Sequence, residues 1–417
     1  MTIATGVAKL VAFKKEASFN VSPTSWTAAV TGAQYLRRVT SDIDIQKDTY
    51  SSNEIRSDYQ VADVRTGTRK VGGTLKGELS PGAYSAFMGS LFRKDFAAIA
   101  ADTAINTVTI ATAAGSTYTL TRGTAGYLAK NWKAGVVAQI TAQTGGTASN
   151  MNKNLFIVDV TDTVMTVIPG GDGTLVTGAP TSVTLTHNGK YSYTPETGHT
   201  NDSYAIEHYY SDLTVGEVFS GCRIASMDIA LPATGIATID IGVLGVDVNG
   251  GGTWPATSQY FSSPTAASAY GILTAVAGKL RIAGSSIATI TGLSMKIDGG
   301  MTTGATVGSN VTPDVFAGRV VVTGQFTAYF DSITLRNLFL NETSFELLCV
   351  LYADGSNAAD YISFAMYKCK ALGAAKSDGE QGLILTVPFQ ALLNTTPATN
   401  TTDDTLRTTL MVSDSKA

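Results

Sequence analysis

The stretch DVRTGTRKVGGTLKGELSPGAYSAFMGSL at residues 63–91 has a counterpart, DVFAGRVVVTGQFTAYFDSITLRNLFL, at residues 314–340. Both copies contain alternating apolar and polar residues, which predict a strand with one buried face. An apolar i, i+3, i+4 pattern follows in both and predicts a short helix. Ser80 and Asp331 stand between strand and helix at aligned positions and are helix-capping residue types. Because strand, cap and helix recur in register, the sequence predicts an internal duplication.

A second match aligns Cys222 with Cys369 and Gly235 with Gly382 at a shorter spacing, so the first copy contains a long additional segment. Its alternating runs predict a five- or six-stranded small barrel or sandwich with Trp132 in its core. If this insertion is peripheral, its deletion should leave assembly intact. The predicted organisation is an N-terminal arm at 1–35, a discontinuous first repeat domain at 36–96 and 199–250, an inserted small β domain at 97–198, and a second repeat domain with a C-terminal strand at 251–417.

The composition predicts a mainly β protein, because the chain is rich in Thr, Ala, Gly and Val, with 42 glycines and only 15% charged residues. A net charge of -4 argues against a nucleic-acid-binding surface, which is normally basic. No run of eighteen apolar residues could span a membrane, and the first residues lack a secretory signal. The three cysteines form no CxxC pair, which favours reduced, buried thiols in a chain made in a cytoplasm.

The sequence offers no convincing catalytic, cofactor or metal site. His187, His199 and His208 lie close together, but their spacing fits no zinc signature. No nucleophile elbow and no phosphate-binding loop occur. The carboxylates Glu78, Asp228, Asp240 and Glu380 could supply an acid pair for glycoside hydrolysis, yet any β-rich chain of this length has such residues. Catalytic, cofactor-binding and metal residues are therefore all predicted to be none.

A duplicated unit of strands can use its open sheet edges to bind copies of itself. Head-to-tail contacts close into a ring when the rotation fits, and strands from all units then form one barrel. With two units per chain, a sixfold ring needs only three chains.

Three segments, at 35–84, 220–245 and 310–330, together resemble the tail tube (major tail) proteins of long, non-contractile-tailed bacteriophages of the siphophage type. The resemblance implies two homologous tail-tube β-sandwich or partial-barrel domains, each with a short flanking helix. It also implies a structural virion protein that self-assembles into stacked rings around the channel for genome ejection. The duplication favours a homotrimeric, pseudo-hexameric ring. The implied partners are ring neighbours and tape-measure, tail-terminator and distal tail proteins, with DNA passing through unbound and no membrane contact.

In such proteins a long loop reaches the neighbouring ring, and residues 46–65 match it, with a repeat counterpart at 296–316. The predicted inter-ring residues are charged: Lys47, Asp48, Glu54, Arg56 and Asp58. An ordered loop of this length is uncommon without a role. The N-terminal arm is expected to cross to another subunit.

Alternation along the strands also proposes a channel lining. The polar faces carry Lys76, Glu78, Ser226, Asp228, Thr238, Asp240, Gln325, Thr327, Thr386 and Gln390. An acidic or neutral wall suits a passing polyanion, because basic side chains bind phosphates through counterion release. The other interpretation is that these faces look outward to solvent.

Two further functions remain open on the residues alone. One is another all-β virion or surface protein, such as a capsid decoration or adhesin module. The other is a β-sandwich carbohydrate-active enzyme, which would need clustered aromatics beside paired carboxylates. Electron microscopy separates the three by the presence of hollow tubes, isolated rings or neither.

Overall fold

The structure is a computed structural model that describes residues 3–20, 30–146, 148–171, 173–248, 259–286, 289–377, 382–395 and 407–417. The chain is mainly β, as predicted, with α1 (Ser85–Phe92) and α2 (Thr334–Leu340) as the α helices of these ranges. Glu380, one of the candidate carboxylates, lies outside the described residues.

The same series of elements occurs twice along the chain. The first series is β4 (Asp44–Ser51), β5 (Val64–Glu78), α1, β14 (Tyr204–Tyr210), β15 (Val215–Pro232) and β16 (Thr238–Gly245). The second is β20 (Ile290–Asp298), β23 (Val321–Tyr329), α2, β24 (Phe345–Tyr352), β25 (Tyr361–Ala371) and β27 (Ile384–Ala391). We call these two series unit 1 and unit 2.

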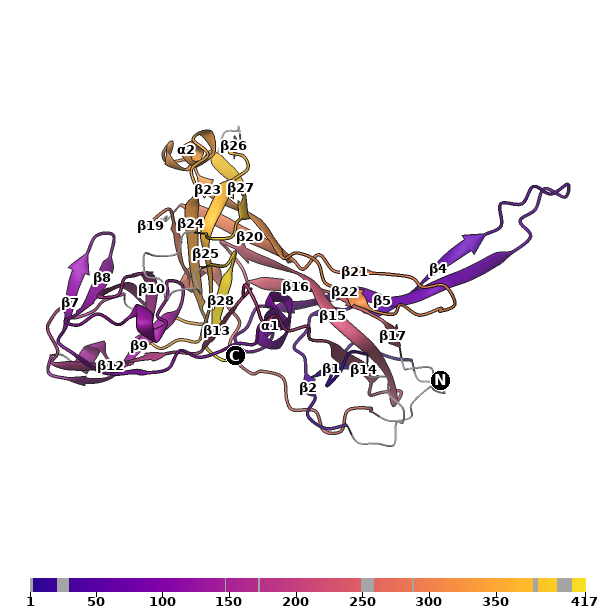
Figure 1. Ribbon diagram of the computed structural model, residues 1–417, viewed down its shortest axis with the longest axis horizontal. Helices are drawn as coiled ribbons and strands as arrows, with labels where there is room; N and C mark the ends of the chain where they lie inside the picture. The colour runs from indigo at the N-terminus through magenta and orange to yellow at the C-terminus, as the bar shows by residue number, and fades with distance from the viewer. Residues whose placement is uncertain are drawn as a thin grey trace.

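The two units share one inner sheet (Figure 1). Antiparallel pairing gives the strand order β4-β5-β16-β15-β20-β23-β27-β25. The units meet where Ser226–Pro232 of β15 pairs with Gly292–Asp298 of β20. Short strands extend the edges: β3 (Thr40–Ser41) pairs with β5, and β26 (Ala375–Lys376) pairs with β27. Each unit therefore contributes four long strands in the same order.

An outer layer covers the apolar face of this sheet. In unit 1, β1 (Lys9–Lys15), β14 and the first half of β15 form it. In unit 2, β18 (Lys279–Ile282), β24 and the first half of β25 form it. The core between the layers includes Phe87, Tyr204, Ile229, Phe326 and Phe389, all fully buried. The short strands β2 (Gln34–Tyr35), β17 (Asp247–Val248), β19 (Ser285–Ser286), β21 (Thr302–Thr303) and β22 (Val315–Phe316) complete the edges.

The aligned glycines Gly73 and Gly324 lie where the preceding strand crosses close to the backbone. A Cβ on Gly73 would lie 2.5 Å from the Cα of Ile43. A Cβ on Gly324 would overlap the carbonyl oxygen of Ser294, on the preceding strand of unit 2. The repeat therefore needs glycine at this position for space rather than for backbone freedom.

The predicted helix caps are wrong. Helix α1 begins at Ser85 and α2 at Thr334, later than the cap residues Ser80 and Asp331 require, and neither helix has a side-chain cap from its N-cap residue. The Ser80 hydroxyl instead donates a hydrogen bond to the carbonyl oxygen of Tyr270 at 3.0 Å. The apolar i, i+3, i+4 pattern predicts seven buried helix residues; Phe339 is instead 39% exposed, and the other six are buried: Tyr84, Phe87, Met88, Leu91, Leu335 and Leu338.

The additional segment of unit 1 folds as a separate sheet in the order β6-β12-β9-β10-β11-β8-β7. These strands are β6 (Asp102–Asn106), β7 (Val108–Ala113), β8 (Thr117–Arg122), β9 (Val137–Thr144), β10 (Leu155–Val160), β11 (Val164–Pro169) and β12 (Ser182–His187). Trp132 is fully buried in its core, as predicted. The sheet has seven strands rather than five or six. We call it the inserted sheet.

The inserted sheet is not a peripheral appendage. Its core is continuous with the outward face of unit 2 and includes Leu348, Val350, Tyr361 and Met411, all fully buried. Beyond the sheet, β13 (Lys190–Tyr193) pairs with the C-terminal strand β28 (Met411–Asp414), and β28 also pairs with β25. A segment that belongs to unit 1 by sequence thus covers unit 2.

The expectation that the N-terminal arm crosses to another subunit is wrong for the part that forms β1, because β1 pairs with β14 of the same chain. The outward face of unit 1 is covered by residues 259–265, whose Tyr260 and Phe261 backbone N–H groups donate to the buried carboxylate of Glu207 at 2.6 and 3.2 Å. Burial raises the pKa of Glu207 to about 7.

Candidate assembly surfaces

The ten proposed channel residues lie on one face of the inner sheet. Directly opposite residues on paired strands share a face, and one such row runs Lys76, Asp240, Asp228, Lys296, Thr323 and Gln390 across six strands. All ten side chains are exposed or half-buried, whereas the alternate residues enter the core. The structure therefore brings together on one surface residues that are far apart in the sequence.

Charges of both signs lie together on this polar face. Lys76 Nζ lies 3.3 Å from Asp240 Oδ2, and Asp228 stands directly opposite both Asp240 and Lys296. Glu78 and Asp298 add negative charge nearer the ends of the strands. These two lysines and four carboxylates leave the face only weakly negative, which is the character expected of an acidic or neutral wall.

The inner sheet has an open edge at each end within the described part of the chain. At one end, β4 pairs only with β5. At the other, Ala371–Lys376 pairs on one side only, with β27. Unpaired backbone groups on such edges are ready to bind another strand. The sequence predicts open sheet edges but does not locate the one at 371–376, because these residues lack strand alternation.

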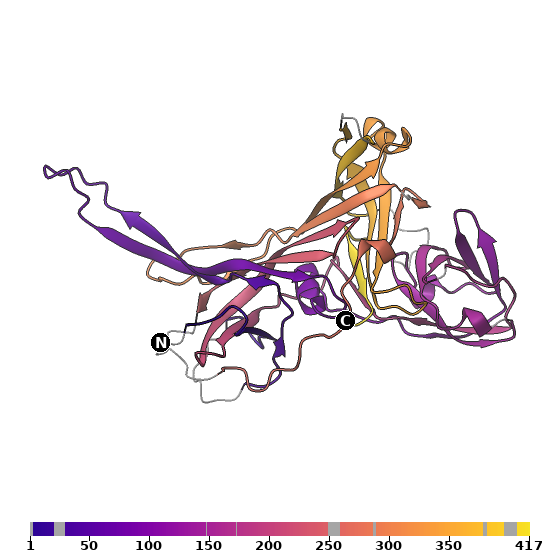
Figure 2. The ribbon, with the colours of Figure 1, turned by 180° about the vertical axis from the view of Figure 1, so that it is seen from behind.

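The predicted inter-ring loop forms the tip of a long hairpin of β4 and β5 that projects far from the rest of the chain (Figures 1 and 2). Lys47 and Asp48 lie on β4, and Glu54, Arg56 and Asp58 lie at the tip; all are exposed. Arg56 forms an ion pair with Asp58 at 2.9 Å. Three apolar side chains at the tip are also exposed: Ile55 (100%), Tyr59 (97%) and Val61 (67%). We call the projecting hairpin of β4 and β5 the arm, and its residues 52–63 the arm tip.

The counterpart loop of unit 2 does not project in this way. Its residues Asn310 and Thr312 bond to the backbone of Arg69 on β5, with N···O distances of 2.8 and 3.2 Å. Arg69 also forms an ion pair with Asp247 at 2.7 Å. The second loop therefore lies along the base of the arm, and the described part of each chain has a single free arm.

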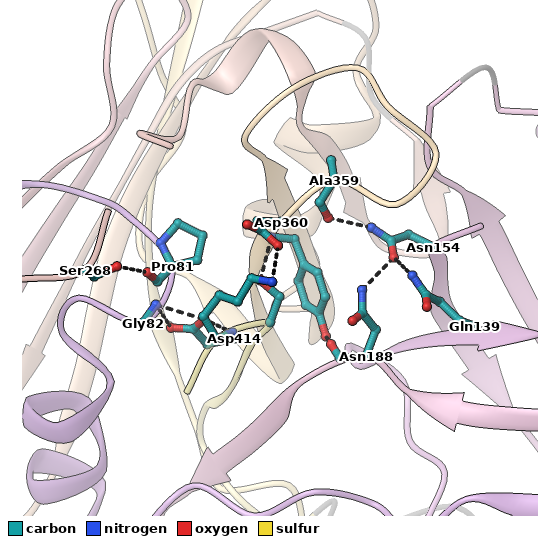
Figure 3. Close-up of polar contacts among 12 residues, drawn as sticks. Pro81, Gly82, Gln139, Asn154, Asn188, Ser268, Ala359, Asp360 and Asp414 are labelled. Atoms are coloured by element: carbon teal, nitrogen blue, oxygen red, sulfur yellow. Dashed lines mark hydrogen bonds and ion pairs between the residues drawn. The ribbon is translucent and has the colours of Figure 1, made fainter. Parts of the chain in front are cut away.

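The C-terminal strand joins three parts of the chain (Figure 3). Asp414 accepts hydrogen bonds from the Gly82 N–H and the Ser85 hydroxyl at 2.9 and 2.7 Å, at the start of α1. Its neighbour Ser413 lies 3.1 Å from His187 Nε2 of the inserted sheet. Burial raises the pKa of Asp414. No sequence pattern predicts this contact, because its partners lie more than two hundred residues apart in the chain.

A second polar cluster fixes the inserted sheet to unit 2 (Figure 3). Asn154 Nδ2 donates to the carbonyl oxygen of Ala359 at 2.7 Å. Its Oδ1 accepts from Gln139 and Asn188, at 2.7 and 2.8 Å. A fully buried amide with all these partners orients the two sheets relative to each other.

The three histidines are not brought together as a metal site. His187 and His208 are buried, and burial lowers the pKa of each to about 3, so both are neutral. His208 Nε2 lies 2.8 Å from the Ser41 hydroxyl, and His199 is exposed. Among the described residues, no group of three or more His, Cys, Asp or Glu side chains could hold a metal ion. Cys222, Cys349 and Cys369 are buried free thiols.

The model of a known protein family matches residues 6–391, a family described as phage tail tube protein. The chain belongs to the phage tail tube protein family. A search of the curated proteins found no match. Membership assigns the chain a structural role as a tail tube subunit and places it in the virion tail. Across the described residues, no helix combines the length and the apolar character needed to span a bilayer.

Proposed function

We propose that three copies of this tail tube subunit close into a ring with six pseudo-equivalent units, whose inner sheets form one barrel around the genome. The observation that carries the proposal is the β15–β20 junction, where unit 1 already joins unit 2 by strand pairing. The same junction can be repeated between chains because unit 2 ends in the strand that corresponds to β15. Unit 1 begins with the strand that corresponds to β20. Three chains of eight inner strands would supply a barrel of twenty-four.

The internal junction predicts the register of the junction between chains. Asp228 lies opposite Lys296 in the internal pairing. The position of unit 2 equivalent to Asp228 is Ala375. Asp228 lies opposite Asp240 of β16, and Ala375 lies opposite Thr386, the residue of β27 that corresponds to Asp240. The position of unit 1 equivalent to Lys296 is Asp44. Lys296 lies opposite Thr323 of β23, and Asp44 lies opposite Gly72, the residue of β5 that corresponds to Thr323. Ala375 of one chain should therefore lie opposite Asp44 of its neighbour.

Charge supports this pairing. The edge that unit 2 would donate carries Lys368, Lys370 and Lys376, whereas the receiving edge of unit 1 is negative overall, with Asp42, Asp44 and Asp48 beside a single Lys47. In this register no lysine lies directly opposite an aspartate, so the charges act through the net sign of each edge, which favours unlike edges meeting over like ones. The contact is then heterologous, which is the kind that closes rings.

A paired cysteine experiment tests the ring. The double variant Ala375→Cys with Asp44→Cys should form a disulfide between neighbours, because opposite residues on paired strands have Cα atoms about 4.5–5.5 Å apart. On a non-reducing gel the ladder should end at three chains. The control pair, Ala375→Cys with Thr49→Cys, lies about 17 Å out of register and should not link. A ladder that continues beyond three chains would rule out the trimer.

Within this ring, we propose that the polar face of the inner sheet lines the channel, because the opposite face is the core. Genome ejection through a nearly neutral wall follows from weak phosphate binding. The free arm would reach an adjacent ring and stack the rings into a tube. Tape-measure, tail-terminator and distal tail proteins are the proposed further partners at the channel and at the tube ends.

A further inference from the structure

The two helices of the repeat present different outward stripes, although they hold equivalent places. At the constant spacing of the duplication, Gly82, Ser85 and Gly89 correspond to Ile333, Arg336 and Leu340. These positions are separated by three and four residues and so share one side of a helix. At these positions the first unit has only small residues, whereas the second unit has two large apolar residues and an arginine.

The stripe on α1 is closed by the chain itself. Gly82 and Ser85 bond to Asp414, and a Cβ on Gly82 would meet the Lys416 side chain at 2.9 Å. A Cβ on Gly89 would lie 3.1 Å from the carbonyl oxygen of Lys94. The C-terminal strand and the chain that leads to the inserted sheet leave no room for another partner here.

The corresponding stripe on α2 is open. Ile333 and Leu340 are each 56% exposed, and the neighbouring Phe339 is 39% exposed. Arg336 forms no ion pair with any described residue. Contiguous exposed apolar side chains with a charge among them are typical of a protein–protein contact. We call Ile333, Arg336, Phe339 and Leu340 the α2 stripe.

Each chain carries one open α2 stripe and one free arm. The arm tip presents Ile55, Tyr59 and Val61 to solvent. It also carries Glu54, whose carboxylate has no ion-pair partner in the described part of the chain. The second loop is folded back on Arg69, so it offers no second arm. Stripe and arm tip therefore match in number, in apolar character and in charge, since Glu54 can pair with Arg336.

The arm and the stripe also lie at opposite ends of the inner sheet. Strands β5 and β23 run in the same direction, because four successive antiparallel pairings separate them. The arm precedes β5, whereas α2 follows β23. Figure 1 shows the two features far apart, so a chain cannot bring its own arm to its own stripe. In a head-to-tail stack the arm of one ring points toward the α2 end of the next.

We propose that the arm tip of each chain docks on the α2 stripe of a chain in the adjacent ring. This inference rests on the proposed stacked rings and names the surface that receives the arm. The contact is apolar, with Ile55 and Tyr59 against Ile333 and Leu340. An ion pair between Glu54 and Arg336 orients it.

Two variants that each remove one side of the contact test the proposal. The stripe variant carries Ile333→Asp and Leu340→Asp, and the arm variant carries Ile55→Asp and Tyr59→Asp. All four side chains are exposed, so the chains should fold, which circular dichroism and the mass of the isolated ring check. Each variant alone should form rings and no tubes in electron micrographs. The control Val176→Asp, on the inserted sheet, should form tubes like the unmodified chain.

Mixing the two variants gives the decisive result. A ring of the stripe variant still has arms, and a ring of the arm variant still has stripes, so the mixture should give stacks of two rings that grow no further. Tubes of normal length from the stripe variant alone would overturn the proposal. So would a mixture that remains as single rings, because the two surfaces would then not meet.

A charge exchange gives a second readout. Arg336→Glu should shorten tubes several-fold, and Glu54→Arg in the same chain should restore their length if the two residues pair. No recovery would overturn the ion pair and its docking geometry. Rings without tubes from the unmodified chain would overturn both the stacking and this contact. Tubes that form normally with a shortened arm would overturn the proposed role of the arm itself.

Discussion

The Ser85 hydroxyl donates a hydrogen bond to Asp414 Oδ2 at 2.7 Å, across a separation of 329 residues. This contact anchors the C-terminal strand at the start of α1 in the first unit, while the same strand pairs with β25 of the second. The last residues of the chain thus hold the two units in one arrangement.

Asp414→Ala should destabilise the chain by about 1–3 kcal/mol, because the backbone N–H groups of Gly82 and Lys416 and the buried Ser85 hydroxyl lose their acceptor. Asp414→Asn keeps an acceptor oxygen and should lose less. Thermal unfolding measures both against Asp48→Ala, an exposed site on β4 where the change should stay within about 0.5 kcal/mol. Equal stability of Asp414→Ala and the unmodified chain would contradict the anchoring role.

The stability of the chain should fall as pH rises from about 4.5 to about 7, because Glu207 is buried and its pKa is raised to about 7 from 4.5. In that range the folded chain binds the proton more tightly than the unfolded chain, so ionisation favours unfolding. The loss should be of the order of 3 kcal/mol at most. Glu207→Gln cannot ionise, and its denaturant midpoint should vary less across this range. An unchanged pH slope in the variant would refute this assignment.

Excision of the inserted sheet, residues 102–187, should damage the fold rather than leave it intact. The cut exposes the outward side chains of unit 2, each worth about 1.5–3 kcal/mol when fully buried. A lower melting temperature and binding of an apolar dye are expected. Removing only Ala114–Ser116, the turn of the β7–β8 hairpin, is the control and should change neither. Normal tubes after the full excision would contradict the shared core.

Asp228→Lys should slow DNA release from assembled virions if the polar face lines the channel, because the new cation binds phosphates. The delay should shrink as salt rises. Asp159→Lys makes the same charge change on the exposed side of the inserted sheet and serves as the control. Ejection at the same rate in both variants would indicate that Asp228 does not face the channel.

The duplicated series of elements and the mainly β class could be predicted from the sequence, because local alternation sets which side of a strand is buried. The polar residues of the inner sheet could also be named, for the same reason. The starts of the two helices could not be predicted, because neither Ser80 nor Asp331 caps its helix and both helices begin later than these residues suggest. Phe339 fits the apolar helix pattern yet is exposed, because nothing in the part of the chain that the structure describes covers that side of α2.

By itself the sequence determined the periodic features: two homologous units, a strand and helix in each, and an additional β segment within the first. Only the tertiary structure decided which edges stay open, that the additional segment covers the second unit, and that one arm is free while its counterpart is folded back. The physical reason is the separation along the chain over which each kind of interaction acts. Alternation and helix spacing act between neighbours in the chain, whereas edge pairing, core sharing and the Asp414 contact join residues hundreds of positions apart.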